Sequence, residues 1–363
     1  MTANDFAGAY RNRRVLVTGH TGFKGSWLSL WLRELGAEVR GLALAPDTEP
    51  SHHKLLGAPD EAPVDLRDAD AVKERLRSAA PEIIFHLGAQ SLVRRSYRDP
   101  IETVAVNVLG LAHLFEAARA TPSVRALVNI TTDKCYENDG RRQGYREEDP
   151  LGGYDPYSAS KACSEILSSS WRRSFLTSGE RNPPLLLATA RAGNVLGGGD
   201  WAPDRLVPDL MRCAANRATT PIRYPESTRP WQHVLEPLSG YLELGRRLLA
   251  GETAIASAWN FGPPAEGVLP VRELAGMMAA RWPAIQLELD KEMHPHEAHA
   301  LALDWSRARN TLGWRPVWGA ARMVERTVDW YRAWTEGQVV RTLDDLSAYR
   351  DDARRAGLSW AGA

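Results

Sequence analysis

Short apolar runs alternate with amphipathic stretches through the first half of the chain. Four of these runs have the length and composition of buried strands: residues 14–17, 37–44, 82–87 and 126–131. Between the first two runs, residues 24–35 carry apolar side chains at helical spacing, and Gly36 is a typical helix stop. Strands that alternate with helices predict parallel βαβ units with right-handed crossovers. The predicted fold class is therefore α/β, a doubly wound parallel sheet of the Rossmann type.

The pattern changes after about residue 195, where loops rich in glycine, proline and tryptophan replace the regular alternation. Within residues 231–262, a helical stretch and a short apolar run are predicted to return to the first sheet. We therefore predict a Rossmann domain over residues 1–195 and about 231–262. A smaller, discontinuous C-terminal domain would contain about 196–230 and 263–363.

Composition narrows the classes of partner. The 363 residues are 44% hydrophobic and 25% charged, which is ordinary for a globular enzyme with a large core. Basic residues and acidic residues are equal in number, at 45 each. The chain has no block of basic residues, so we expect no nucleic-acid partner. We find no signal peptide and no run long and apolar enough to cross a bilayer, so no membrane partner is expected. Three scattered cysteines argue against a disulfide framework and favour a reducing cytoplasm.

A glycine-rich turn joins the first predicted strand to the first helix. Residues 18–25 read Thr-Gly-His-Thr-Gly-Phe-Lys-Gly. Glycines let the backbone approach a pyrophosphate closely, and the helix N-terminus supplies N–H groups and partial positive charge. This context favours a dinucleotide site over a plain structural turn. The predicted cofactor-binding residues here are Gly19, Thr21, Gly22, Phe23, Lys24 and Gly25.

The adenosine end of this predicted site is less distinctive. NAD-selective folds usually carry an acidic residue at the end of the second strand, but Asp47 is the nearest one here. No arginine stands there to favour a 2′-phosphate. Asp65 and Leu66 follow another strand-like segment and are predicted to meet the adenine. We expect NAD as cofactor, with NADP as the open alternative.

Tyr157 and Lys161 lie one helical turn apart and would share a helix face. A phenol with a pKa of about 10 is a poor base at neutral pH, but a nearby ammonium group and an oxidised nicotinamide lower that pKa. Thr132, at the end of a predicted strand, would join the same proton network. The three residues predict removal of a hydroxyl proton coupled to hydride transfer, against the alternative of an exposed helix face. Asp133 and Lys134 follow Thr132 directly and suggest a second proton-transfer step.

The order of these motifs resembles the extended short-chain dehydrogenase/reductase family. The motifs are, in chain order, the glycine turn, residues 86–90 (His-Leu-Gly-Ala-Gln), Asn107, Thr132 and the Tyr157/Lys161 pair. Gly88 departs from the family, which more often has alanine there. The resemblance places Leu87, Ala89 and Asn107 at the cofactor. Further segments resemble the CDP-glucose 4,6-dehydratases of this family: residues 133–136, 153–158, 191–195, 198–201, 229–238 and 294–299.

This resemblance implies conversion of CDP-D-glucose to CDP-4-keto-6-deoxy-D-glucose and water, with hydride passing through bound NAD. Asp133 would donate a proton to the leaving 6-hydroxyl, and Lys134 would be the base at carbon 5, where related dehydratases carry glutamate. A lysine with an ordinary pKa of about 10.4 must be strongly perturbed to do this. The alternative for Lys134 is a salt bridge to Asp133 or a solvated side chain. The rival enzymes are a dehydratase for another nucleotide sugar and a 4-epimerase, and the distant rival is a non-catalytic dinucleotide sensor.

The substrate residues are assigned by chemistry. A nucleotide-sugar diphosphate needs cations and amide donors, which predicts roles for Asn194, Arg205, Arg229 and His233. The alternative for His233 is a structural histidine with its hydrogen bonds satisfied. His294, His296 and His299 raise a metal alternative, but no cysteine or acidic ligand completes a set, so we expect no metal. Residues 101–120 and 157–175 are predicted amphipathic helices. Family members pair such helices between subunits, which implies a homodimer, although packing within one chain is also possible.

Overall fold

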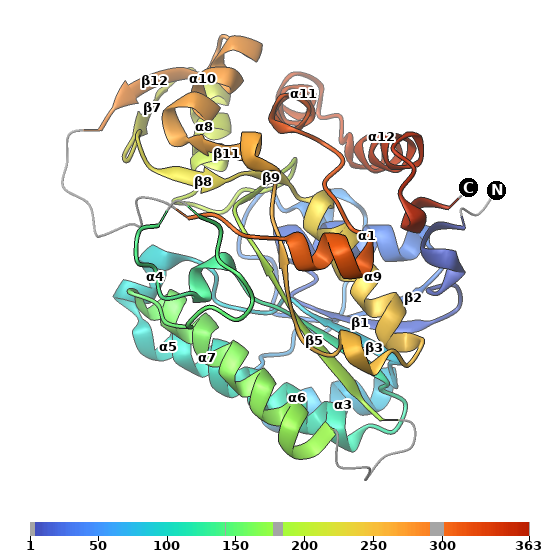
Figure 1. Ribbon diagram of the computed structural model, residues 1–363. Coiled ribbons are helices and arrows are strands. Elements are labelled where there is room, and N and C mark those ends of the chain that lie inside the picture. The colour runs from blue at the N-terminus through green and yellow to red at the C-terminus, as the bar shows by residue number, and fades with distance from the viewer. Residues whose placement is uncertain (1–3, 142, 177–183, 291–300, 363) are drawn as a thin grey trace.

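A six-stranded parallel sheet organises the chain (Figure 1). The computed structural model describes residues 4–141, 143–176, 184–290 and 301–362. The strands follow the order β10-β5-β4-β3-β1-β2 across the sheet. Their bounds are β1 Arg14–Thr18, β2 Glu38–Leu42, β3 Ile83–His86, β4 Ala126–Ile130, β5 Leu186–Ala192 and β10 Ala258–Phe261. The predicted fold class is confirmed, and β10 returns from late in the sequence to pair with β5.

Alternate residues of the central strands β1, β3, β4 and β5 fill two separate cores. Val15 and Val17 of β1 pack on one face with α1 (Phe23–Glu34) and α9 (Leu235–Leu249). Leu16 points to the other face, where α3 (Ala69–Ala79) and α6 (Gly110–Ala120) cover the sheet. Because both faces of the sheet are buried at its centre, β1 and β3 are largely apolar along their length rather than alternating.

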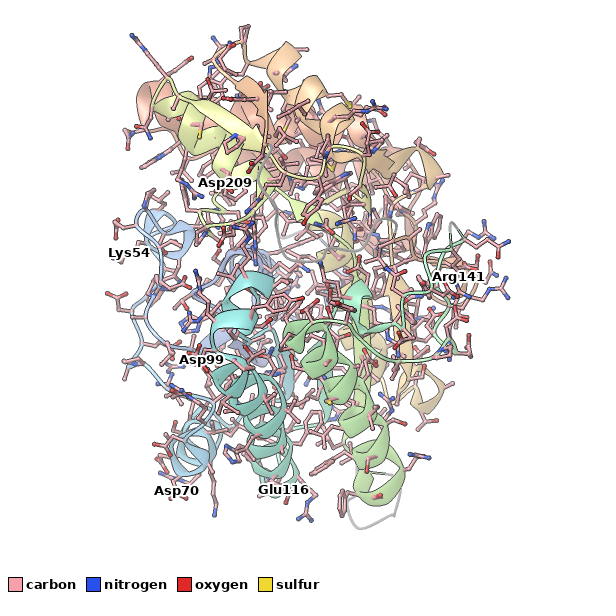
Figure 2. All side chains as sticks on the ribbon, turned by 90° about the vertical axis from the view of Figure 1, so that its left-hand side faces the viewer. Lys54, Asp70, Asp99, Glu116, Arg141 and Asp209 are labelled. Atoms are coloured by element: carbon pink, nitrogen blue, oxygen red, sulfur yellow. The ribbon has the colours of Figure 1, made fainter. Side chains whose placement is uncertain are left out.

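The sequence predicts no segment long and apolar enough to cross a bilayer, and the helix that begins at Pro100 corrects this prediction. Helix α5 (Pro100–Val104), the π-helical turn η2 (Ala105–Leu109) and α6 form one continuous helix of 21 residues, long and apolar enough to cross a membrane by length and composition. Core helices of globular proteins pass the same test. Part of this helix packs on α3 and on α7 (Pro156–Trp171). Figure 2 shows it beside α7, with Asp99 at its start and Glu116 on α6.

A smaller layer lies over the carboxyl edge of the sheet (Figure 1). Its core combines residues of α8 (Leu206–Ala215), α10 (Val271–Arg281) and α11 (Ala320–Gly337). Three two-stranded pairs complete it: β7 (Thr219–Ile222) with β12 (Gln286–Leu289), β8 (Thr228–Pro230) with β11 (Val268–Pro270), and β6 (Val195–Leu196) with β9 (Gln232–His233). The short helices are α2 (His52–Leu55) and α4 (Val93–Arg98). The division into two domains stays a prediction.

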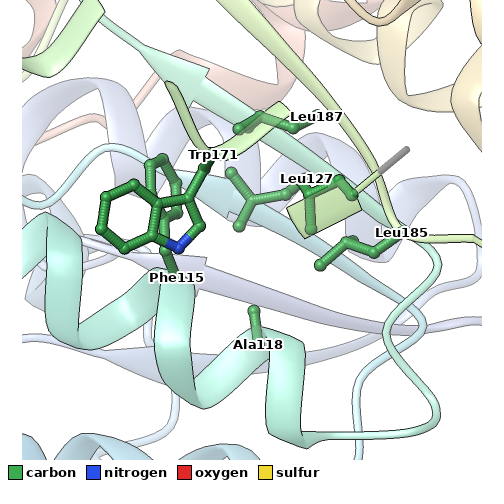
Figure 3. A pocket seen from close by; sticks show the side chains of 7 residues that line it. Phe115, Ala118, Leu127, Trp171, Leu185 and Leu187 are labelled. Carbon is green, nitrogen blue, oxygen red and sulfur yellow. The ribbon is translucent and has the colours of Figure 1, made fainter. Parts of the chain in front are cut away.

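An apolar pocket lies between α6, α7 and the sheet (Figure 3). Its lining consists of Phe115, Ala118, Leu127, Trp171, Leu176, Leu185 and Leu187. None of these side chains is ionisable, and the indole N–H of Trp171 donates to Glu116. We interpret the pocket as a gap in core packing rather than as a reaction site.

The C-terminal segment packs back onto the sheet layer through Glu236, in the first turn of α9. Its carboxylate accepts hydrogen bonds from the backbone N–H groups of Val317 (3.0 Å) and Trp318 (2.7 Å), and from the Tyr349 hydroxyl on α12 (Thr342–Arg355; 2.8 Å). Burial raises the pKa of Glu236 to about 7. The carboxyl therefore holds its proton in the folded chain over a pH range where the unfolded chain has lost it.

This raised pKa predicts a pH-dependent stability. The stabilisation from Glu236 is fully present below its unfolded pKa of about 4.5 and is lost as the pH rises through about 7. Relative to Glu236→Gln, the wild-type chain should therefore lose about 2.5 kcal/mol of unfolding free energy between pH 5 and pH 8. Denaturant titrations of both proteins at the two pH values measure this difference. If the wild-type chain and Glu236→Gln differ in unfolding free energy by the same amount at pH 5 and pH 8, the raised pKa of Glu236 is contradicted.

Candidate active site

A cleft of about 680 Å³ lies where the carboxyl ends of the central strands meet the smaller layer. All five residues predicted to be catalytic line it: Thr132, Asp133, Lys134, Tyr157 and Lys161. They come from two elements, the turn after β4 and the first turns of α7. The fold thus brings together the two motifs that were separate in the sequence.

The turn after β4 is held by its own threonine. Strand β4 ends at Ile130, and a 3₁₀ turn, η3 (Asp133–Cys135), follows. The Thr132 hydroxyl donates to Oδ1 of Asp133 (2.9 Å) and accepts from the backbone N–H of Lys134 (3.4 Å). The same hydroxyl is close enough to the Tyr157 phenol to lower the pKa of Tyr157. Thr132 therefore connects Tyr157 on the helix to Asp133 on the turn.

Asp133 is 1% exposed, and its second carboxylate oxygen, Oδ2, has no hydrogen-bond partner within the described part of the chain. Burial raises the pKa of this carboxyl, although the nearby charge of Lys134 and the bond from Thr132 act against the rise. A raised pKa favours the protonated form, which is the form a general acid needs. An unpartnered buried oxygen that borders a cleft is also a natural place for a ligand.

Helix α7 presents Tyr157 and Lys161 to the same cleft. Asp155 caps the helix by accepting from the backbone N–H of Ser158 (2.9 Å), and Lys161 Nζ donates to the carbonyl of Ile130 (3.3 Å). Burial lowers the pKa of Lys161 to about 8. It raises the pKa of Tyr157 to about 12, against the lowering effects of Thr132 and of the Arg205 charge. Without further positive charge, Tyr157 is therefore a weaker acid than a free phenol.

The glycine turn meets the geometric demands of a dinucleotide site. Gly19 has φ +68°, and a Cβ there would lie 2.8 Å from the backbone nitrogen of Gly88. A Cβ on Gly25 would lie 2.0 Å from the carbonyl oxygen of Gly19. Helix α1 begins after Gly22 without a side-chain cap, and its first residues line the cleft. The turn, the uncapped helix end and the cleft volume all fit a dinucleotide.

Most residues predicted to bind cofactor line the cleft: Gly19, Thr21, Gly22, Phe23, Lys24, Gly25, Asp65, Leu66, Leu87 and Ala89. Asn107 is the exception. It is 2% exposed, and its amide bonds the backbone N–H and carbonyl of Gln90 (2.8 and 2.9 Å) and the Ser160 hydroxyl (2.9 Å). Asn107 thus fixes the segment after β3 from behind, while that segment borders the cleft.

The predicted substrate residues divide in the same way. Asn194, Arg205 and Arg229 line the cleft, and Arg205 forms an ion pair with Asp200 (3.0 Å). His233 is fully buried and outside the cleft lining. Its ring packs on Trp318, with centroids 4.8 Å apart, and burial lowers its pKa to about 3. The structure places His233 in the core as a neutral ring.

Three further cations border the cleft: Arg94, Arg95 and Arg223. Arg94 of α4 and Arg223 both approach the carboxylate of Asp204 at 3.4 Å, and neither arginine was predicted from the sequence. The adjacent Arg94 and Arg95, a few residues after a buried strand, were the available signal. Lys24, which is predicted to bind the cofactor, lines the cleft near Arg205 and Asp133. Burial lowers its pKa to about 8.

The predicted histidine loop cannot be evaluated, because His294, His296 and His299 lie outside the described residues. Among the residues that the structure does describe, no group of three or more histidine, cysteine or acidic side chains could hold a metal ion. The three cysteines are free.

Comparisons with known proteins agree with this geometry. A model of the GDP-mannose 4,6 dehydratase family matches residues 16–179. The chain is 48% identical to a CDP-glucose 4,6-dehydratase from Salmonella typhimurium, over 95% of this chain and 98% of that protein. The chain belongs to the nucleotide-sugar 4,6-dehydratases. The resemblance to this branch of the short-chain dehydrogenase/reductase family is thereby confirmed.

More distant dehydratases share the fold and its length. A dTDP-glucose 4,6-dehydratase from Streptomyces antibioticus is 30% identical over 89% of this chain and 94% of that protein. A crystal structure of a double mutant of the Streptomyces venezuelae dTDP-glucose 4,6-dehydratase, with NAD bound, superposes with a TM-score of 0.72. It is 26% identical and covers 88% of this chain and 96% of its own. This chain thus has the architecture of the 4,6-dehydratases.

Proposed function

We propose that the chain converts CDP-D-glucose to CDP-4-keto-6-deoxy-D-glucose and water. The observation that carries the proposal is the buried carboxyl of Asp133, with one unpartnered oxygen, beside Lys134 and linked through Thr132 to Tyr157. An acid and an amine next to a redox tyrosine are what dehydration requires beyond simple oxidation. The 48% identity to a CDP-glucose 4,6-dehydratase supports the choice of CDP-glucose.

We propose NAD as the cofactor, held by the glycine turn, by the residues that follow β3, and by Tyr157 and Lys161. The NAD bound in the related Streptomyces venezuelae structure supports this choice, and Asp65 and Leu66 are proposed to meet the adenine end. Asn107 would support the site through Gln90. When NAD is bound, its nicotinamide supplies the acceptor for hydride from carbon 4 and the donor of hydride to carbon 6.

Tyr157 is the proposed base for the first step, the oxidation of carbon 4. It accepts the proton of the 4-hydroxyl as that carbon is oxidised, and Lys161 supplies positive charge beside it when protonated. The burial that raises the pKa of Tyr157 to about 12 also strengthens any charge placed next to it. A cationic ring bound in the cleft would therefore lower that pKa efficiently.

Asp133 and Lys134 are the proposed acid and base for the second step, the elimination of water across carbons 5 and 6. The new ketone acidifies the hydrogen at carbon 5, which Lys134 removes, while Asp133 protonates the 6-hydroxyl so that it leaves as water. The Thr132 hydroxyl gives Asp133 a path to recover its proton from Tyr157. After hydride reaches carbon 6, Lys134 returns a proton to carbon 5. The cycle then closes with one water released and every residue in its starting state.

Three residues are proposed to bind the nucleotide sugar. Arg205 and Arg229 provide cations for the diphosphate, and Asn194 provides an amide for a phosphate or sugar oxygen. Arg94 and Arg223, which face the same cleft, add positive charge. His233 would act only through core packing behind Gly197.

Incubation of the purified protein with CDP-glucose in deuterated water tests the proposed reaction. The expected product is a 4-keto-6-deoxy sugar that carries deuterium at carbon 5, detected by NMR and mass spectrometry, with added NAD but not NADP supporting turnover. Parallel reactions with UDP-, dTDP- and GDP-sugars determine the nucleotide preference. A 4-epimerised sugar that keeps its 6-hydroxyl would refute the dehydratase, and retained cofactor without any turnover would favour a sensor.

Lys134→Met tests the assignment of the base. Loss of a general base typically slows its step by about 10²–10⁴-fold, so exchange at carbon 5 and water loss should fall by that factor. Oxidation at carbon 4 should persist, because Tyr157 and Lys161 are untouched. Lys73→Met, on the exposed face of α3, is the matched control and should behave as wild type. Intact exchange and water loss in Lys134→Met would show that another group is the base.

We also propose a cytoplasmic homodimer. Four apolar side chains on the outer faces of α5, η2 and α7 are 48–77% exposed: Ile101, Val104, Leu109 and Ile166. An apolar face formed by two adjacent helices favours pairing with the same face of a second copy. The free cysteines fit a reducing compartment, which fractionation of the producing cell would check.

Ile166→Glu should convert the dimer to a monomer, because it places a charge at the centre of the proposed contact. Sedimentation velocity at micromolar concentration measures the change. Leu343→Glu, at a similarly exposed position on α12, is the control and should leave the dimer intact. A monomeric wild-type protein, or a dimer that tolerates Ile166→Glu, would exclude this interface.

A further inference from the structure

A buried ion pair lies behind the catalytic turn, and the proposed reaction uses neither partner. Glu165 of α7 and Arg191 of β5 are 2.9 Å apart, with side chains 1% and 4% exposed. Burying two charges costs much of what their attraction returns, so such a pair is weak evidence of a role in stability. The groups that it contacts are more informative about its role.

The pair contacts both ends of the catalytic turn. On one side, the Thr131 hydroxyl donates to Oε1 of Glu165 (2.5 Å). On the other side, Arg191 Nη1 donates to the Tyr136 hydroxyl (2.7 Å), and the guanidinium lies 4.9 Å from the centre of the Tyr136 ring. Thr131 and Tyr136 flank residues 132–135. Asp133 and Lys134 are therefore carried on a short turn whose two ends are tied to one ion pair.

The same pair relates that turn to the redox residues. Glu165 follows Lys161 by one turn of α7, so the carboxylate and the ammonium stem from one rigid helix. The Tyr136 hydroxyl also donates to Asn260 of β10 (2.8 Å), which anchors the far end of the turn to the sheet. The position of Asp133 and Lys134 relative to Tyr157 thus depends on contacts made by Glu165 and Arg191.

We propose that Glu165 and Arg191 are positioning residues for the elimination half of the reaction. They hold the turn so that Asp133 and Lys134 reach carbons 6 and 5 of a sugar already oriented by Tyr157. This inference rests on the proposed dehydratase function. It separates the two halves of the reaction: loosening the turn impairs elimination, whereas oxidation at carbon 4 depends on α7 and continues.

Single hydroxyl deletions test the inference without removing either charge. Thr131→Val and Tyr136→Phe each release one end of the turn. Thr189→Val is the matched control, because the Thr189 hydroxyl donates to Oε2 of the same carboxylate (2.7 Å) from β5 and does not belong to the turn. For each variant, we would measure product formation, deuterium uptake at carbon 5, and the absorbance of reduced nicotinamide during turnover.

In Thr131→Val and Tyr136→Phe, product formation and deuterium uptake should fall on the order of 10- to 100-fold, since small misplacements of reacting groups have effects of this size. Reduced nicotinamide should accumulate, because oxidation outpaces elimination. Thr189→Val should show neither change. A merely structural role would lower oxidation and elimination together and leave the cofactor oxidised.

Two outcomes would overturn the inference. One is a proportional loss of both half-reactions without accumulated reduced cofactor, and the other is the same accumulation in Thr189→Val. Thermal unfolding of each variant identifies gross misfolding, and Tyr136→Phe, which keeps the ring in place, decides the question if Thr131→Val does not fold. Failure of the wild-type chain to make any 4-keto-6-deoxy sugar would instead refute the proposed function.

Discussion

Burial of a parallel sheet on both faces is the constraint on which this structure depends. Alternate side chains of the central strands β1, β3, β4 and β5 enter two different cores, so the polar groups of these strands can meet a ligand only at the strand ends. Parallel strands have their carboxyl ends at one edge, where the glycine turn, the turn after β4 and Asn194 after β5 all lie. The position of the cleft follows from this arrangement.

The same burial sets the chemistry of that edge. Desolvation raises the pKa of Asp133 and of Tyr157 and lowers that of Lys161, so each group shifts toward its neutral form. Groups in this condition respond strongly to any charge that binds beside them, because the local dielectric constant is low. A bound cofactor and substrate can therefore change the protonation of the whole site.

The ion pair of Glu165 and Arg191 behind the site differs from these groups, because both of its members are charged. Besides its ion pair with Arg191, the Glu165 carboxylate also accepts from Thr131 and Thr189. Their ionisation is thus stabilised locally and does not require a ligand. The structure combines a permanently charged support with a reactive layer whose charge depends on what is bound, and the turn of residues 132–135 lies between them.

The sequence by itself determined the strand and helix rhythm, the glycine turn and the two catalytic motifs, because these depend on local periodicity and on short, fixed spacings. It left open whether His233 faces the cleft or packs in the core, and it did not indicate that Asn107 acts from behind Gln90. Which side of an element faces a cleft depends on segments distant in the chain. Tertiary structure alone decided that β10 pairs with β5, and that Glu165 and Arg191 contact both ends of one turn. Those contacts join residues separated by 26 to 124 positions, and only the packed core brings them within hydrogen-bonding distance.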